Sequence, residues 1–306
     1  MKVLIATDKP FAAEAVNSIR KVVEDAGFQC LLLEKYTEKS QLLDAASEAN
    51  AIIIRSDIID AEVLNASKNL KIVVRAGAGY DNVDLETATA NNVCVMNTPG
   101  QNSNAVAELA LGMMVYAMRN FYDGSSGGEL LGKKLGIHAY GNVGRNVARV
   151  AKGFGMEVFA FDPYCPAEVM EKDGVKQLNS AEELYSTCQF VSLHIPATAE
   201  TKNSINYDLL SKMPKKALLV NTARKEVINE AELVKFMEDR QDFKYVTDVM
   251  PSNHEEMLTK YAKRYYSTPK KIGAQTAEAN NNAGIAAANQ IVDFFKTGNQ
   301  KFRVNK

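Results

Sequence analysis

The chain has 306 residues, which at roughly 100–200 residues per domain is enough for two domains. Hydrophobic residues make up 46% and charged residues 24%, values typical of soluble globular proteins, so the composition argues against a disordered chain. With 36 basic and 37 acidic side chains the net charge is −1, and nothing in it indicates a binding surface for nucleic acid or an anionic membrane.

The start of the chain lacks the features of a secretory signal. The apolar run Val3 to Ala6 is followed at once by polar Thr7, which is too short for the apolar part of a signal peptide, and we therefore expect a cytoplasmic protein. The most apolar long stretch, 105–118, contains Glu108 and is shorter than the ~20 residues that a membrane span needs. No membrane partner is expected.

Cysteine and histidine spacing gives no sign of a metal site. The four cysteines are far apart and form no C-x-x-C pair, so we expect reduced thiols. The three histidines show no metal-ligand spacing, and we expect no metal. These residues are Cys30, Cys94, Cys165, Cys188, His138, His194 and His254.

Short β-branched runs alternate with helix-period segments along the whole chain. This alternation is typical of α/β proteins with parallel sheets. The expected strands fall into two series, which predicts two parallel sheets. They are 3–5, 51–54, 71–74 and 93–96 in the first series, and 135–137, 158–161, 190–193, 217–220 and 245–247 in the second.

A turn and a long helical pattern separate the two series. The turn signal is 97–100, Asn-Thr-Pro-Gly, and the helical pattern runs from about 104 to 119; we expect this helix to bridge two domains. The last helix, about 277–296, is predicted to return to the first domain through one apolar face. That face would consist of Ile285, Ala288, Ile291, Val292 and Phe295.

The segment 136–144, Gly-Ile-His-Ala-Tyr-Gly-Asn-Val-Gly, lies between an expected strand and an expected helix. In this context a glycine-rich turn brings backbone amides against a pyrophosphate. Ala139 stands where the motif G-x-G-x-x-G has its first glycine, so the turn must take a conformation that tolerates a methyl group. Gly141 permits close approach of a ligand, and Gly144 permits tight packing of the helix.

Asp162 ends the strand that follows this turn, 21 residues after Gly141. An acidic side chain at this place accepts hydrogen bonds from both adenosine ribose hydroxyls and repels a 2′-phosphate, which favours NAD over NADP. The plainer alternative is that Asp162-Pro163-Tyr164 is only a turn.

Several further motifs recur in a fixed order along nearly the whole chain. They are 75–84, 97–102, 107–109, 194–196, 220–224, 248–249 and 272–276. On these motifs and the glycine turn the chain resembles the D-2-hydroxyacid dehydrogenase family. Within that family it is most similar to the phosphoglycerate dehydrogenases, in a short form without a C-terminal regulatory domain.

The resemblance implies a flavodoxin-like substrate domain into which a Rossmann-type NAD domain is inserted. The substrate-binding domain would be 1–98 plus 277–306, and the NAD-binding domain would be 99–276. A cleft between them would hold NAD and a 2-hydroxy acid, and its closure would exclude water. The family also typically forms homodimers through the cofactor domain.

Arg224 matches the family's catalytic arginine. It follows an expected strand, and its planar guanidinium suits a substrate carboxylate. The acid/base position departs from the family, because Lys271 and Asn253 stand where other members carry a histidine and a glutamate. Lysine donates a proton readily at neutral pH, but it needs a lowered pKa to act as a base.

Other residues stay open as the proton carrier. The proline before this segment lies one residue further away than usual, so Lys270 is an alternative to Lys271. His254 and Glu255 adjoin the position of the family's glutamate and are further alternatives.

The resemblance assigns substrate binding to the backbone amides of Ala78 and Gly79 and to Asn102. Arg55 and Arg75 each follow a strand of the first domain, and two guanidinium groups near one site would suit a phosphate. This pair favours phosphoglycerate over unphosphorylated acids. Alternatively, both are solvated charges at strand ends.

The remaining residues are implied to bind the cofactor. They are Gly141, Asn142, Val143 and Gly144 at the pyrophosphate, Asp162, Tyr164, His194 and Pro196 on the adenosine side, Thr222, Ala223 and Asp248 near the nicotinamide, and Gly273 and Ala274.

We therefore expect an enzyme that oxidises 3-phospho-D-glycerate to 3-phosphohydroxypyruvate with NAD, the first step of L-serine biosynthesis. One alternative is another D-2-hydroxyacid dehydrogenase, such as a glyoxylate or hydroxypyruvate reductase. Another is a catalytically inactive NAD-sensing regulator, because the family's histidine and glutamate are absent.

Overall fold

The computed structural model describes residues 1–305, which form two compact units. The first comprises residues 1–102 and the described residues from 275 to 305, and the second comprises Ser103–Ala274. The chain therefore leaves the first unit and returns to it, with crossings a few residues from the 98/99 and 276/277 boundaries expected from the sequence. The first crossing is shifted because the turn at 99–102 belongs to the same unit as the strand before it.

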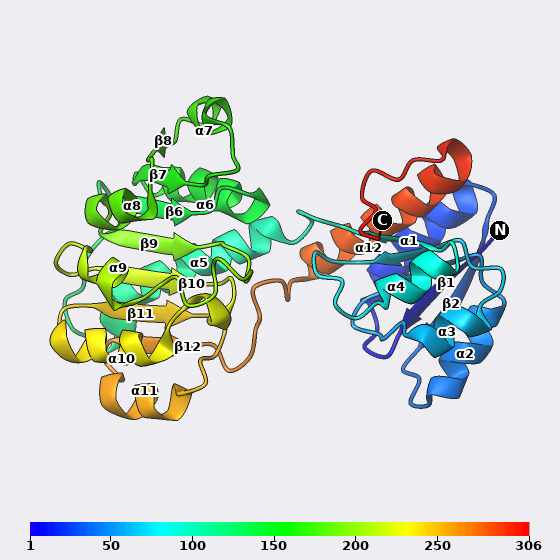
Figure 1. The fold of residues 1–306 in the computed structure, drawn as a ribbon, viewed down its shortest axis with the longest axis horizontal. Coiled ribbons are helices and arrows are strands. Elements are labelled where there is room, and N and C mark those ends of the chain that lie inside the picture. Colours follow the sequence, from blue (N-terminus) through cyan, green and yellow to red (C-terminus); the bar gives the residue numbers. More distant parts are fainter. Residues whose placement is uncertain (306) are drawn as a thin grey trace. The chain divides into compact units, whose positions relative to one another are not determined.

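A five-stranded parallel sheet forms the centre of the first unit (Figure 1). Its strand order, β2-β1-β3-β4-β5, is that of flavodoxin-like folds, which confirms this part of the predicted fold class. One apolar cluster lies between the sheet and α1 and α12, and another lies between the opposite face and α2, α3 and α4. The elements are β1 (Lys2–Thr7), α1 (Ala13–Asp25), β2 (Gln29–Glu34), α2 (Lys39–Ser47), β3 (Ala51–Ile54), α3 (Ala61–Ala66), β4 (Ile72–Arg75), α4 (Leu85–Ala90), β5 (Cys94–Asn97) and α12 (Ala277–Thr297).

The second unit contains a seven-stranded parallel sheet in the order β12-β11-β10-β9-β6-β7-β8. Apart from one added edge strand, this is the Rossmann order, and the direction of winding reverses between β6 and β9. The helical elements are α5 (Ser103–Met118), η1 (Asn120–Tyr122), α6 (Asn142–Gly153), α7 (Ala167–Lys172), α8 (Ala181–Thr187), α9 (Tyr207–Ser211), η2 (Lys225–Val227), α10 (Glu230–Asp239) and α11 (His254–Tyr261). The strands are β6 (Lys134–His138), β7 (Glu157–Phe161), β8 (Lys176–Gln177), β9 (Phe190–Leu193), β10 (Leu218–Asn221), β11 (Lys244–Thr247) and β12 (Tyr265–Ser267).

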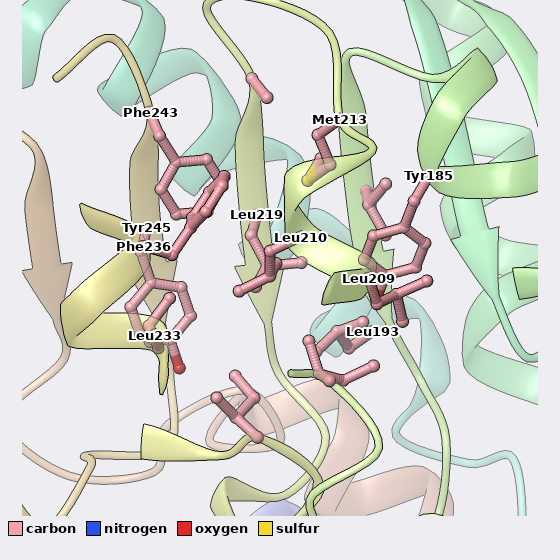
Figure 2. Close-up of a cluster of buried hydrophobic side chains, with 14 of the residues drawn as sticks. Tyr185, Leu193, Leu209, Leu210, Met213, Leu219, Leu233, Phe236, Phe243 and Tyr245 are labelled. Atoms are coloured by element: carbon pink, nitrogen blue, oxygen red, sulfur yellow. The ribbon is translucent and has the colours of Figure 1, made fainter. Parts of the chain in front are cut away.

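Apolar side chains cover both faces of this second sheet. Figure 2 shows one cluster, in which Leu210, Leu219 and Phe236 from α9, β10 and α10 come together. The other cluster lies under α5 and α6. The strands are thus buried on both sides, which explains why most of them appear in the sequence as continuous apolar runs.

Three strands are missing from the sequence prediction: β2, β8 and β12. All three lie at sheet edges, where one side of a strand has no neighbour and the residues need not be apolar. β8 has only two residues, both exposed. Edge position and short length therefore account for the missed strands.

The prediction that the helix after the turn bridges two domains is wrong. α5 lies wholly within the second unit, where it packs on α6, β10 and β11. Its buried residues include Ala107, Leu111 and Met114, so its apolar surface is used within one core.

The predicted apolar face of α12 is confirmed in part, because Ala288 and Ile291 are fully buried. Ala283, Ala287 and Ile291 are buried, whereas Ile285 and Val292 are only half-buried. The reason is close packing on α1, because a Cβ at Gly284 would lie 2.6 Å from the Ile19 side chain. A strip of small residues, together with Ile291, therefore faces the core.

Within residues 1–305 no helix is long and apolar enough to cross a membrane. The same residues contain no cluster of three or more His, Cys, Asp or Glu side chains arranged to hold a metal ion. All four cysteines are free thiols.

Candidate active site

The glycine turn lies at the point where the strand order of the second sheet reverses, between β6 and α6. Dinucleotides bind at such switch points. The prediction that this turn adopts a conformation suited to a methyl group is wrong, because Ala139 has φ +78°. An L-residue pays about 1–2 kcal/mol for that left-handed conformation, so the turn keeps the geometry of a glycine and carries the strain.

The two other glycines of the turn differ in what surrounds them. A Cβ at Gly144 would lie 2.4 Å from the Ala139 carbonyl oxygen, so α6 packs tightly on the turn. A Cβ at Gly141 would meet no protein atom within 4 Å. Gly141 also caps α6 without a side chain, so the first amides of the helix, at Asn142 and Val143, remain available to an anion.

Asp162 follows β7 beside this turn. Its Oδ2 accepts a hydrogen bond from the Tyr140 amide at 2.7 Å, and its Oδ1 accepts one from the Tyr164 amide at 2.8 Å. The residue thus stabilises the local turn, as the plainer interpretation expects. Each oxygen retains a second lone pair, which leaves acceptors for ribose hydroxyls.

A cavity of about 940 Å³ opens next to Asp162. Three of the residues that the sequence places on the adenosine side, Asp162, Tyr164 and Pro196, line it. The sequence analysis did not anticipate Glu182 and Lys212, which also line the cavity. They are on helices α8 and just after α9, and no motif marks them.

Two histidines flank this region in the neutral state. Burial lowers the pKa of His138 to about 4 and that of His194 to about 3. His138 lies 3.4 Å from the Tyr185 hydroxyl, and His194 lies 2.9 Å from the Ser192 hydroxyl. Both imidazoles are therefore uncharged at neutral pH and contribute packing and hydrogen bonds.

The loop after β10 is organised by a residue that the sequence analysis missed. Asn221 is fully buried; its Oδ1 accepts from the Ala223 amide, and its Nδ2 donates to the Arg224 carbonyl, both at 2.9 Å. These bonds hold the backbone at Ala223 and Arg224, whereas the side chain of Arg224 is exposed. Thr222 is buried, and its Oγ1 has no partner among residues 1–305.

Lys271 and Arg224 meet at one carbonyl oxygen. The Lys271 Nζ donates to the Ala223 oxygen at 3.1 Å, and the Arg224 Nη1 donates to the same oxygen at 2.9 Å. Although Lys271 is exposed as a residue, its ammonium end is withdrawn from water. This desolvation, followed by the nearby charge of Arg224, lowers the pKa of Lys271 to about 8.

Asp248 holds the loop that carries Lys271. Its carboxylate is fully buried and accepts from the Thr268 hydroxyl, the Ile272 amide and the Gly273 amide, each at 2.8 Å. A Cβ at Gly273 would lie 2.9 Å from Asp248 Oδ2, so only glycine fits there without displacement. The resemblance placed Asp248 near the nicotinamide and assigned Gly273 to cofactor binding, and the structure shows a hydrogen bond between them.

The structure separates Lys271 from the alternatives. Lys270 is exposed on the same loop, whereas the ammonium of Lys271 is hydrogen-bonded beside Arg224. His254 lies in the first turn of α11 with Glu255, and its Nδ1 is 2.8 Å from the Tyr265 hydroxyl. Lys271 is therefore the residue that the fold brings to the loop of Arg224. Ala274 is the last residue of the second unit.

In the first unit, Arg55 and Arg75 lie at the ends of adjacent strands. β3 and β4 pair so that Ile54 is opposite Arg75, and the Arg75 Nε donates to the Arg55 carbonyl at 2.9 Å. A Cβ at Gly77 would lie 1.6 Å from Arg75 Nη1, so the guanidinium rests directly on this glycine. Both Nη groups of Arg75 have no acceptor within the described part of the chain.

The neighbouring segment contains the backbone expected to bind a carboxylate. Ala78 is exposed, and its carbonyl accepts from the Asn97 side chain at 2.6 Å. Gly79 is half-buried beside Asp81. Asn102 is the last residue of this stretch of the first unit.

The second unit also matches a known family model. The model for the "D-isomer specific 2-hydroxyacid dehydrogenase, NAD binding domain" matches residues 105–270. The chain belongs to the D-isomer specific 2-hydroxyacid dehydrogenases. The predicted family and the predicted Rossmann-type NAD domain are thereby confirmed.

Individual relatives agree with this family. A D-3-phosphoglycerate dehydrogenase of Methanocaldococcus jannaschii is 34% identical over 83% of this chain and 51% of that protein. A hydroxypyruvate reductase of Thermotoga maritima is also 34% identical, over 84% of this chain and 88% of that protein. The chain thus spans about half the length of the phosphoglycerate dehydrogenase and most of the reductase.

Solved structures show the same fold over the whole chain. The NAD⁺-bound 3-phosphoglycerate dehydrogenase of Entamoeba histolytica is 45% identical, with a TM-score of 0.86 and coverage of 100% of this chain and 99% of that chain. A D-2-hydroxyisocaproate dehydrogenase, at 20% identity and a TM-score of 0.84, agrees in fold. The open space at Gly141, the uncapped amides of α6 and the cavity beside Asp162 fit an NAD cofactor in this family's NAD domain.

Proposed function

We propose that this protein is an NAD-dependent dehydrogenase that oxidises 3-phospho-D-glycerate to 3-phosphohydroxypyruvate, the first step of L-serine biosynthesis. The observation that carries the choice of substrate is the pair Arg55 and Arg75 on adjacent strand ends, with unused N–H donors on both guanidinium groups. A phosphate dianion with several acceptor oxygens suits two such groups.

The reaction removes a hydride from C2 of the substrate and a proton from the hydroxyl group on C2, so that C2 becomes a ketone. The hydride acceptor would be supplied by NAD⁺, held at the glycine turn and beside Asp162. In this proposal Arg224 binds the C1 carboxylate and stabilises the negative charge that develops on the C2 oxygen. Neutral Lys271 takes the hydroxyl proton and becomes an ammonium ion, and in the reverse direction it returns that proton.

The lowered pKa of Lys271, about 8, supports its role in both directions. A lysine at its ordinary value of about 10.4 would rarely be free to accept a proton near neutral pH. Lys271 also replaces the histidine and the glutamate of other family members with a single group, because a lysine needs no carboxylate to set its tautomer.

Cofactor binding is proposed for the glycine turn and the loops beside it. Asn142, Val143 and Gly144 would bind the pyrophosphate through α6, and Asp162 would bind the adenosine ribose and disfavour NADP. Tyr164, His194 and Pro196 would flank the adenosine. Thr222, Ala223 and Asp248, with Gly273 and Ala274, would flank the nicotinamide. Ala78, Gly79 and Asn102 would bind the substrate carboxylate.

The test follows NADH absorbance in both directions. Phosphoglycerate and phosphohydroxypyruvate are compared with unphosphorylated glycerate and hydroxypyruvate, in the wild type and in Lys271→Ala. We expect turnover that prefers the phosphorylated acids and falls about 10²–10⁴-fold in the variant. Equal turnover of hydroxypyruvate would favour the reductase activity of the Thermotoga relative, and NAD binding without turnover of any acid would favour a regulator.

We also propose that the protein works in the cytoplasm as a homodimer formed through the second unit. The support is an exposed apolar patch there: Leu131 is 69% exposed and Phe154 is 43% exposed, and both line one groove. Exposed apolar side chains that lie together are typical of a protein interface.

A further inference from the structure

The amide of Asn280 is held in one orientation at the start of α12. Thr276 caps this helix, and its Oγ1 accepts from the Ala279 amide at 3.0 Å. The Asn280 Nδ2 donates to the Thr276 carbonyl at 2.8 Å. Since the nitrogen faces a carbonyl, the Oδ1 must face the other way, where a donor is required.

That donor is the guanidinium of Arg55. The Arg55 Nη2 donates to Asn280 Oδ1 at 2.7 Å, and Nη1 donates to the carbonyls of Lys9 and Pro10 at 3.2 Å each. The guanidinium also lies over the Phe11 ring, 5.1 Å from its centroid. Of the five N–H donors of an arginine these bonds use three, which leaves the Nε–H and one Nη2–H for a ligand.

The backbone of Arg55 is held as firmly as its side chain. The Arg55 amide donates to Asp57 Oδ2 at 3.2 Å, and Asp57 Oδ1 accepts from the Tyr36 hydroxyl at 2.6 Å and the Asp8 amide at 2.7 Å. Asp57 is buried and 4% exposed. Arg55 is thus restrained at both ends, with only part of its donor set in use.

We propose that Asn280 is a positioning residue that aims Arg55 at the phosphate of the substrate. A free arginine side chain loses rotamer entropy when it binds a ligand, whereas a side chain that is already oriented does not. The inference rests on the proposed function and deepens it, because it names a residue that determines the preference for phosphorylated acids. Asn280 itself need not touch the substrate.

The experiment compares Asn280→Ala, Asn280→Asp and Asn282→Ala with the wild type. Asn282 is exposed on the same helix and serves as the matched control. Asn280→Asp places a carboxylate against the guanidinium, where it neutralises Arg55 and suits the first turn of a helix, so this variant should fold. Steady-state kinetics are measured with phosphohydroxypyruvate and with hydroxypyruvate, and thermal melting checks the fold.

For both Asn280 variants we expect KM for the phosphorylated acid to rise about tenfold or more, as expected for a weakened charged hydrogen bond. The kcat, the kinetics with hydroxypyruvate and the melting temperature should stay close to those of the wild type. Unchanged KM values, or an equal loss with both acids, would overturn the inference alone. A wild type without preference for the phosphorylated acid would overturn it together with the proposed function.

Discussion

Ala139 shows how one residue can keep the conformation of the glycine that it replaces. Its φ of +78° costs an L-residue about 1–2 kcal/mol. Replacement by glycine removes this strain, but part of the stability gained is lost because glycine has more conformational freedom in the unfolded chain. We expect Ala139→Gly to raise the free energy of unfolding by about 1 kcal/mol. Denaturant unfolding measures this change. In the control variant Ala286→Gly, in the interior of α12, the free energy of unfolding should instead fall by about 1 kcal/mol. Equal losses of unfolding free energy in both variants would contradict the prediction that Ala139 is strained.

Lys271 predicts a pH dependence at the scale of a single side chain. With its pKa lowered to about 8, the amine is mostly protonated at pH 7 and mostly neutral at pH 9. Oxidation needs the neutral amine and should therefore rise through pH 8, while reduction needs the ammonium and should fall through it. Initial rates in both directions test this. In Lys271→Arg, which stays charged, the shared inflection near pH 8 should disappear; an inflection that persists would assign the titration to another group.

Within an element, the loop 268–273 depends on Asp248. Three donors of this loop converge on one buried carboxylate, and the amide of an asparagine would turn a donor toward at least one of them. We expect Asp248→Asn to lose about 1–3 kcal/mol of stability and also activity, because Lys271 loses its place. Lys271→Ala should lose activity at an unchanged melting temperature. A stable Asp248→Asn enzyme would show that the loop has other support.

At the scale of the whole molecule, the exposed patch at Leu131 and Phe154 predicts assembly. Leu131 also rests on Gly155, where a Cβ would come within 2.5 Å of it. We expect a dimer of the chain in light scattering coupled to size exclusion, and a shift toward monomer in the charged variant Phe154→Asp. Phe28→Asp would disrupt a core and is therefore unsuitable as a control. The control is Tyr164→Asp, because Tyr164 is 85% exposed, and this variant should leave the dimer intact. A wild-type monomer would contradict the prediction.

Much of the architecture could be predicted because its signals are local. Buried parallel strands such as β3 and β10 are continuous apolar runs, and the glycine turn is defined by spacing within nine residues of sequence. The edge strands, the packed face of α12 and the unit that contains α5 depend on which elements become neighbours. Composition within each segment does not specify those neighbours.

The sequence by itself determined the α/β class, the two parallel sheets and the family, and it supplied the candidate site residues as predictions. Only the tertiary structure decided how those residues meet. Asn280 bonds to Arg55 across 225 positions, and Lys271 reaches the Ala223 carbonyl across 48. Such contacts follow from the path of the whole chain and from side-chain rotamers, which a linear pattern does not record.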